Sequence, residues 1–146
     1  MLVLAVSIIF ISGCNNLGKL KLKLHTAERI NVDQYNQSLP LVVNCYQLKD
    51  SKQFGSANFH ELWKQPKTIL DDDLINTEEL IIPPNNKLEK IINIDRKTMY
   101  IAFVGLFNTP GSNWKDILEL QKGLFSKELI VDIQDNSLKI VKTGKS

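Results

Sequence analysis

The clearest pattern in the chain is an alternation of apolar and polar residues over positions 19–32. Three leucines, Ile30 and Val32 share one face of an extended chain, whereas lysines and His25 occupy the other face from position 19 to 25. A period of two predicts a half-buried antiparallel strand. The lysine face has two interpretations, contact with anionic lipid headgroups or a solvated strand surface, and we favour the solvated surface.

Further strands are predicted wherever short apolar or alternating runs are bounded by turn-forming residues. They cover residues 41–48, 79–82, 88–94, 98–107, 128–133 and 138–141. The run 98–107 is apolar on both faces, which indicates a strand covered on one side by an opposing sheet and on the other by helices. Residues 114–120 fit either a helix or a strand, and we favour a strand. The Pro83–Pro84 pair keeps the preceding strand from being central throughout.

A change of period predicts a small helical insertion over about residues 56–75. Ser56 is a candidate N-cap, Phe59, Leu62 and Trp63 share one helical face, and Pro66 ends that segment. A second short helix is predicted over 69–74. Seven or eight strands with one small helical insertion predict an all-β fold in which two sheets form a sandwich.

The charged and nucleophilic residues give little support for catalysis or nucleic-acid binding. The net charge is only +2, and the 18 Lys and Arg residues are dispersed. Asp71, Asp72 and Asp73 are consecutive, so their side chains diverge and do not predict a cation site. His25 and His60 lack a G-x-S-x-G, H-E-x-x-H or Cys–His pattern. We therefore predict no enzymatic activity, with a cell-wall hydrolase as the less favoured alternative and a small-ligand carrier or chaperone as another.

An uncharged apolar run at residues 2–11 leads into Ile11, Ser12, Gly13 and Cys14, which form a lipoprotein signal-peptidase box. The run is about ten residues, shorter than the ~20 that span a bilayer. We predict a signal peptide at 1–13, an acylated Cys14 with a tether at 14–18, and a single domain at 19–146. The alternative is an ordinary cysteine in an apolar strand. Export signals usually open with basic residues, so we expect the natural start to lie upstream.

The second cysteine, Cys45, has no partner for an internal disulfide if Cys14 carries lipid. Cys45 lies among alternating apolar residues, and we interpret it as a small buried side chain rather than a redox centre. Asn15 follows the lipobox cysteine. Because Asp is common there in lipoproteins kept in the inner membrane, Asn15 favours sorting to the outer membrane.

Several blocks together resemble the outer-membrane lipoprotein TssJ (SciN/VasD-like) of type VI secretion systems. They are VNCYQLKD at 43–50, LDDDLI at 70–75, EELIIPPN at 78–85, and YIAFVGLF at 100–107 followed by Trp114 and Lys115. Two positions depart from the family pattern. Asn85 replaces a Gly, which is tolerable because Asn is the next best residue at positive φ, and Asn108 stands where Arg is common.

The resemblance implies a transthyretin-like β-sandwich of two four-stranded sheets, anchored to the periplasmic face of the outer membrane. It implies docking to the carboxy-terminal periplasmic domain of the inner-membrane protein TssM, and through it an indirect association with TssL. No cofactor is implied beyond the covalent lipid on Cys14. The docking element is the loop between the first two strands, which here comprises Asp33, Gln34, Tyr35, Asn36, Gln37 and Ser38. We hypothesise that Tyr35 anchors the contact; the alternative is a Tyr folded back on its own sandwich.

Overall fold

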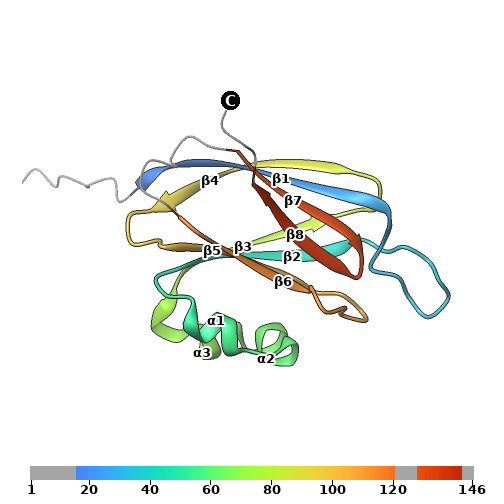
Figure 1. The fold of residues 1–146 in the computed structure, drawn as a ribbon, viewed down its shortest axis with the longest axis horizontal. Helices are drawn as coiled ribbons and strands as arrows, with labels where there is room; N and C mark the ends of the chain where they lie inside the picture. Colours follow the sequence, from blue (N-terminus) through green and yellow to red (C-terminus); the bar gives the residue numbers. More distant parts are fainter. Residues whose placement is uncertain (1–15, 121–127, 143–146) are drawn as a thin grey trace, which may run out of the picture.

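Two four-stranded β-sheets face each other in the computed structural model, which describes residues 16–120 and 128–142 (Figure 1). One sheet has the order β4-β1-β7-β8 and the other the order β3-β2-β5-β6. The predicted two-sheet sandwich is confirmed. The strands are β1 (Asn16–Ile30), β2 (Leu41–Leu48), β3 (Leu74–Ile82), β4 (Lys87–Asp95), β5 (Tyr100–Gly105), β6 (Lys115–Glu119), β7 (Glu128–Asp135) and β8 (Ser137–Lys142).

Strand β1 is central in its sheet, and its neighbours run in different directions. It pairs antiparallel with β4 but parallel with β7, where Leu22 lies opposite Leu129. The expectation of a purely antiparallel strand was therefore wrong on one side. Alternation reports which face of a strand is buried, whereas the direction of each neighbour depends on how the chain connects the strands.

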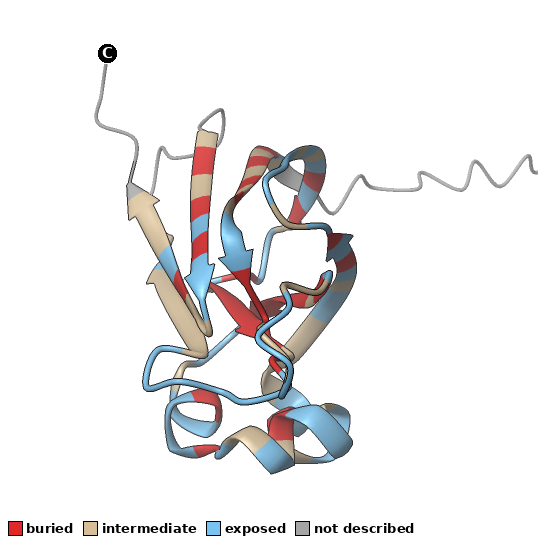
Figure 2. Cartoon of the chain, turned by 90° about the vertical axis from the view of Figure 1, so that its right-hand side faces the viewer, coloured by how far each residue is buried: buried red, intermediate tan, exposed pale blue. Residues whose placement is uncertain are grey.

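The space between the sheets is filled by the apolar faces that the alternation predicts. Figure 2 shows the resulting bands of buried and exposed residues along the strands. The buried side chains include three leucines of β1, Cys45 of β2, Phe103 of β5 and Val131 of β7. Burial raises the pKa of the Cys45 thiol, since ionisation would place a charge in this apolar layer. This environment confirms the interpretation of Cys45 as a packing residue.

A second apolar cluster lies between the β3-β2-β5-β6 sheet and the helical insertion, which covers its outer face (Figure 1). The insertion comprises α1 (Lys52–Ser56), α2 (Phe59–Lys64), α3 (Pro66–Leu70) and the 3-10 turn η1 (Asp71–Asp73). The described side chains that fill this cluster belong to both layers: Tyr46, Leu48, Phe54, Ala57, Leu62, Leu70, Ala102 and Val104. Strand β5 is thus covered on both faces, as its composition predicts.

Two details of the predicted insertion were wrong, and Pro66 has a second role that was not predicted. Helical structure begins at Lys52, before Ser56. The N-cap of α2 is Asn58, whose side-chain oxygen accepts from the Glu61 amide, and the Glu61 carboxylate accepts from the Asn58 amide. Helix α2 ends at Lys64, just before Pro66 as predicted, and Pro66 also opens α3, because a first-turn proline has no amide to satisfy. Trp63 is 48% exposed, and Phe54 packs against the sheet in the position that was expected for Trp63.

The domain begins closer to Cys14 than expected. Residues 16–18, predicted to be a tether, already belong to β1, and Asn16 lies opposite Asp95 of β4. The reason is that strand pairing satisfies the backbone amides and carbonyls of these residues, whatever their polarity. Cys14 itself and the signal segment 1–13 lie outside the described residues. None of the helices in the described part is long and apolar enough to cross a membrane.

Candidate functional site

The loop between β1 and β2 has a closed tip built on Asp33. The Asp33 Oδ1 atom accepts hydrogen bonds from the amides of Tyr35 at 2.8 Å and Gln37 at 2.9 Å. The Asp33 amide donates to the Gln37 carbonyl at 3.0 Å, and Asn36, at φ 63°, donates to the Asp33 carbonyl at 3.1 Å. These local bonds are typical of an Asp-initiated turn, and they fix the backbone on both sides of Tyr35.

The predicted docking residues divide into an exposed tip and a supporting base. Tyr35 is 74% exposed, so the alternative in which it folds back on the sandwich is wrong. Gln34, Asn36 and Gln37 are also exposed. Ser38 is half-buried, and its Oγ accepts the Ile30 amide at 3.1 Å. Ser38 therefore holds the base of the loop.

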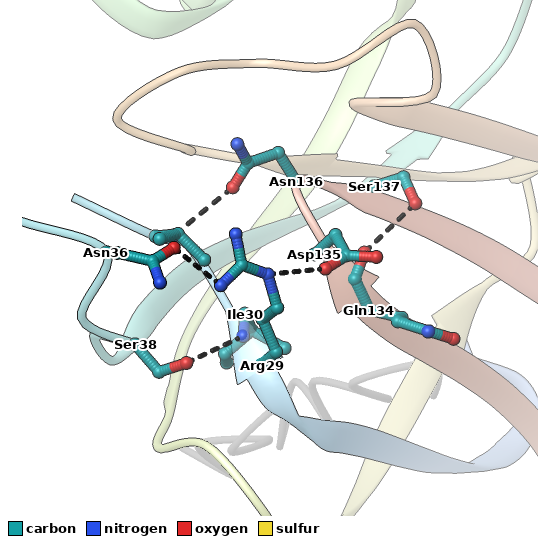
Figure 3. A network of polar contacts seen from close by, with 9 residues as sticks. Arg29, Ile30, Asn36, Ser38, Gln134, Asp135, Asn136 and Ser137 are labelled. Atoms are coloured by element: carbon teal, nitrogen blue, oxygen red, sulfur yellow. Dashed lines mark hydrogen bonds and ion pairs between the residues drawn. The ribbon is translucent and has the colours of Figure 1, made fainter. Parts of the chain in front are cut away.

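Arg29, the penultimate residue of β1, links the tip to the turn between β7 and β8 (Figure 3). Its Nη1 donates to Asn36 Oδ1 at 2.7 Å, and its Nε donates to Asp135 Oδ1 at 3.1 Å. The guanidinium satisfies both partners at once because its donors form a rigid planar fork. One side chain thus sets the position of the tip relative to the β7–β8 turn.

Asn31 ties the base of the loop to the segment after β5. It is only 5% exposed and has a φ of 45°, a conformation that Asn tolerates better than most residues. Its Oδ1 accepts the Asn108 amide at 2.8 Å, and its Nδ2 donates to the Pro40 carbonyl at 2.9 Å. The amide of Asn31 donates to the Asp135 carbonyl at 2.8 Å. Three chain segments therefore meet at one buried residue, two of its bonds being made by the side chain and one by the backbone.

Asn136 completes this framework from the β7–β8 turn. Its Oδ1 accepts the Val32 amide at 3.2 Å, and its carbonyl accepts the Gly111 amide at 3.0 Å. A Cβ at Gly111 would lie 2.9 Å from that carbonyl oxygen, so the close approach requires glycine. The β1–β2 loop, the β5–β6 loop and the β7–β8 turn thus form one connected end of the sandwich, with Tyr35 at its surface.

The predicted docking residues form the tip of this loop, whereas the residues that support it were not predicted. Arg29, Asn31 and Asn136 were not predicted. Asp135 and Asn136 lie between the predicted strands 128–133 and 138–141, so they were expected only in a connection, and Asn31 offers a weak signal as an Asn directly after a strand. Asn108, where the family commonly has Arg, contributes its backbone amide, and its side chain lies in an exposed position.

The lysine row of β1 is largely matched by acidic side chains on the neighbouring strands. Lys21 lies 3.4 Å from Glu89, and Lys23 lies 2.8 Å from Glu128 and 3.5 Å from Glu89. The hydrogen bond that the Lys23 ammonium donates to the Glu128 carboxylate raises the pKa of Lys23. These pairs balance the charge of the row at the middle of the sheet, which favours the predicted solvated face over a lipid-binding one.

The other candidate sites do not assemble. Within the described residues no group of His, Cys, Asp or Glu is placed to hold a metal, Asp71–Asp73 included. His25 lies 3.5 Å from Asp132, whereas His60 packs edge-on against Trp63 on α2. A hollow of about 280 Å³ beside the β3–β4 turn is lined by polar residues: His25, Thr26, Asn85, Asn86 and Lys87. Such a lining does not favour a carrier of apolar ligands.

The family comparison gives one match that covers most of the chain. Residues 18–138 match the model of the type VI secretion lipoproteins, a family described under the names VasD, EvfM and TssJ. No curated protein sequence matches the chain significantly.

Solved structures with the same fold come from type VI secretion systems. The lipoprotein TssJ1 of Pseudomonas aeruginosa is 21% identical with a TM-score of 0.78, covering 88% of this chain and 98% of its own. A chain of a type VI membrane complex is 23% identical with a TM-score of 0.79, covering 86% and 98%. A chain in the structure described as the TssM C-terminal domain from EAEC is 21% identical with a TM-score of 0.75, again covering 86% and 98%. At these identities the likeness establishes the fold.

Proposed function

This chain belongs to the type VI secretion lipoprotein family, and on that basis we propose that it docks the periplasmic carboxy-terminal domain of TssM to the outer membrane. Its membership is established by the match over residues 18–138. The lipid on Cys14 supplies the anchor, and the β1–β2 loop with Tyr35 supplies the contact. The chain acts without catalysis, needs no cofactor beyond that lipid, and reaches TssL only through TssM.

The observation that carries this proposal is the hydrogen-bonded framework beneath Tyr35. Binding costs less when the contact residues are already ordered, because less side-chain and loop entropy is lost. Bonds from Asp33, Arg29 and Asn31 hold the loop in one conformation. An exposed tyrosine on such a base has the properties of an interface anchor, with a large apolar ring and a polar hydroxyl.

The position of the loop relative to the anchor also fits a bridging role. Strand β1 begins at Asn16, two positions after Cys14 in the sequence, and ends at the proposed docking loop, so the start of β1 and the loop lie at opposite ends of the sandwich (Figure 1). Fifteen extended residues span about 45 Å. The loop is therefore presented toward the interior of the periplasm at a height fixed by a single strand. This raises the effective concentration of a partner that crosses the periplasm.

The lipid explains the permanence of such an anchor. Each buried methylene contributes about 0.8 kcal/mol, so one acyl chain binds reversibly whereas the several chains of a lipoprotein cysteine do not leave the membrane. Asn15 after Cys14 is the basis for proposing the outer membrane as the destination.

The test is the affinity of the protein for the purified TssM periplasmic domain, measured with Tyr35→Ala. A hot-spot tyrosine contributes 2 kcal/mol or more, so we expect a loss of at least about 30-fold. Trp63→Ala is the matched control, since Trp63 is an exposed aromatic on the helical insertion. Unchanged affinity for Tyr35→Ala would reject the loop as the docking element, and a loss confined to Trp63→Ala would move the contact to α2.

A further inference from the structure

We propose that the β4–β5 turn, with Lys49 and Lys19 beside it, is a membrane-facing surface that rests on anionic phospholipid headgroups next to the lipid anchor. The surface comprises Lys19, Lys49, Arg96, Lys97 and Met99. This inference rests on the proposed anchoring through Cys14 and adds an orientation to it.

Chain geometry brings this surface to the membrane. Asn16 lies opposite Asp95, so the chain enters the domain directly beside the β4–β5 turn. Only Asn15 separates Cys14 from Asn16, and two residues extend over no more than about 7 Å. An acylated Cys14 therefore holds Asp95 and the residues that follow it at the level of the headgroups. Figure 1 shows the start of β1 and the β4–β5 turn at the same end of the sandwich.

The exposed side chains at this end combine positive charge with one apolar group. Arg96 and Lys97 are exposed, and Met99 is 48% exposed. The Met99 amide donates to the Leu48 carbonyl at 2.9 Å, which brings exposed Lys49 next to it. Basic side chains around an apolar one suit the interface of an anionic bilayer, where phosphates attract the cations and the apolar group enters the headgroup layer.

The turn is held rigidly by a buried glutamine of β2. Gln47 Oε1 accepts from the Asp95 amide at 2.9 Å and from the Thr98 hydroxyl at 2.8 Å, and its Nε2 donates to the Asn93 carbonyl at 2.9 Å. Gln47 is 2% exposed. A rigid turn can transmit the angle at which it meets the membrane to the whole sandwich.

Asp95, at the start of the turn, is the acidic group within the surface, where its Oδ1 accepts the Lys97 amide at 2.8 Å. Further acidic groups at this end lie on the side of the helical insertion. Asp71–Asp73 precede β3, and the Asp73 carbonyl accepts the Lys49 amide at 2.9 Å. Glu119 lies opposite Tyr100 on the edge strand β6. These residues belong to the sheet that carries the helices, and an anionic surface repels them. The β4–β5 turn is attracted to the anionic surface, and the acidic residues are repelled from it. Both effects tilt the domain so that the β4-β1-β7-β8 sheet lies closer to the membrane.

The proposed contact orients the protein and is not needed to keep it on the membrane. Each basic residue near an anionic surface shifts the population of the bound orientation by about fivefold. Strand β1 runs from this surface to the proposed docking loop. A fixed orientation of the surface on the membrane therefore also fixes the direction in which the loop points. The lipid attaches the protein to the membrane, and the β4–β5 turn sets the orientation of the domain on it.

The single methionine of the processed chain provides the test, because Met1 is removed with the signal segment and only Met99 is left. The lipidated protein is reconstituted on vesicles of phosphatidylcholine, with or without phosphatidylglycerol. The rate of Met99 oxidation by dilute peroxide is then followed by mass spectrometry. We expect oxidation to be at least about fivefold slower on the phosphatidylglycerol vesicles, and Arg96→Gln/Lys97→Gln to remove most of that protection.

Lys87→Gln/Lys139→Gln is the matched control, because it removes the same charge from two exposed positions of the sandwich outside the proposed surface. It should keep Met99 protected. Equal oxidation on both kinds of vesicle, or protection that is undiminished in the Arg96/Lys97 variant, would overturn the proposal. Flotation of the protein with the vesicles and its affinity for the TssM domain are measured in the same samples, so loss of anchoring or docking is seen separately from loss of orientation.

Discussion

Replacement of Asn31 by alanine tests whether the proposed docking loop is held by the hydrogen bonds beneath it. The substitution removes the bonds to the Asn108 amide and the Pro40 carbonyl, both under 3.0 Å. Loss of the hydrogen-bond partner of the Asn108 amide and of the Pro40 carbonyl costs about 2 kcal/mol in total, since both groups are partly accessible to water and recover some hydration. The φ of 45° adds about 1 kcal/mol for an L-residue other than Asn or Gly. We expect a total loss of about 3 kcal/mol in the free energy of unfolding.

Urea unfolding of Asn31→Ala, Asn31→Gly and Asn108→Ala separates these contributions. Glycine accepts the positive φ but lacks the amide, so it should lose about 2 kcal/mol. Asn108→Ala keeps the backbone amide that Asn31 accepts and should change stability by less than about 0.5 kcal/mol. The Ala and Gly variants should also bind the TssM domain more weakly, because the loop then loses conformational freedom on binding. An Asn31→Ala protein within 0.5 kcal/mol of the wild type would refute this account of the loop.

Three further predictions concern groups outside the loop. Because burial raises the pKa of Cys45, the thiol stays neutral in the folded protein at pH values where it ionises in the unfolded chain. Above about pH 9 the free energy of unfolding should therefore fall by up to about 1.4 kcal/mol per pH unit. Urea unfolding at pH 7 and pH 10 should show a smaller fall for Cys45→Ala than for the wild type. Lys115→Gln removes an ammonium that donates to the Phe54, Gly55 and Ala57 carbonyls, so limited proteolysis should cut the helical insertion faster than in Lys64→Gln; equal cutting would contradict that role. Gln47→Leu leaves the β4–β5 turn without three hydrogen bonds and should cost about 2–4 kcal/mol by urea unfolding, and a loss under 1 kcal/mol would show that water replaces them.

The local patterns of the sequence were sufficient for most of the strands. The alternating leucines of β1 lie in the core as expected, and the ambiguous segment 114–120 contains strand β6. Asn85 has a φ of 50°, in agreement with its place where the family has glycine. Strand β3, which ends before Pro83, is an edge strand. Each of these features depends on a residue and its near neighbours.

Helix ends inside the insertion were harder to predict, because several neighbouring residues compete for the same role. Ser56 and Asn58 are both good N-caps, but only Asn58 has a glutamate three positions later to complete the capping box. Phe54 and Trp63 are both large and apolar. The available space lies over Tyr46 and Ala102, and Phe54 fills it while Trp63 remains at the surface.

The sequence by itself determined the alternating faces, the turn-rich tip at Asp33–Ser38 and the lipobox at Cys14, because all of these are written in consecutive residues. Only the tertiary structure decided that β1 runs parallel to β7 and that Arg29 reaches Asp135. These two residues are 106 positions apart. Burial can be inferred from a local pattern, but a bond across the fold depends on which strands become neighbours. The same long-range pairing places Asp95 beside Asn16 and so brings the β4–β5 turn to the end of the domain where the chain enters, which is the end proposed to face the membrane.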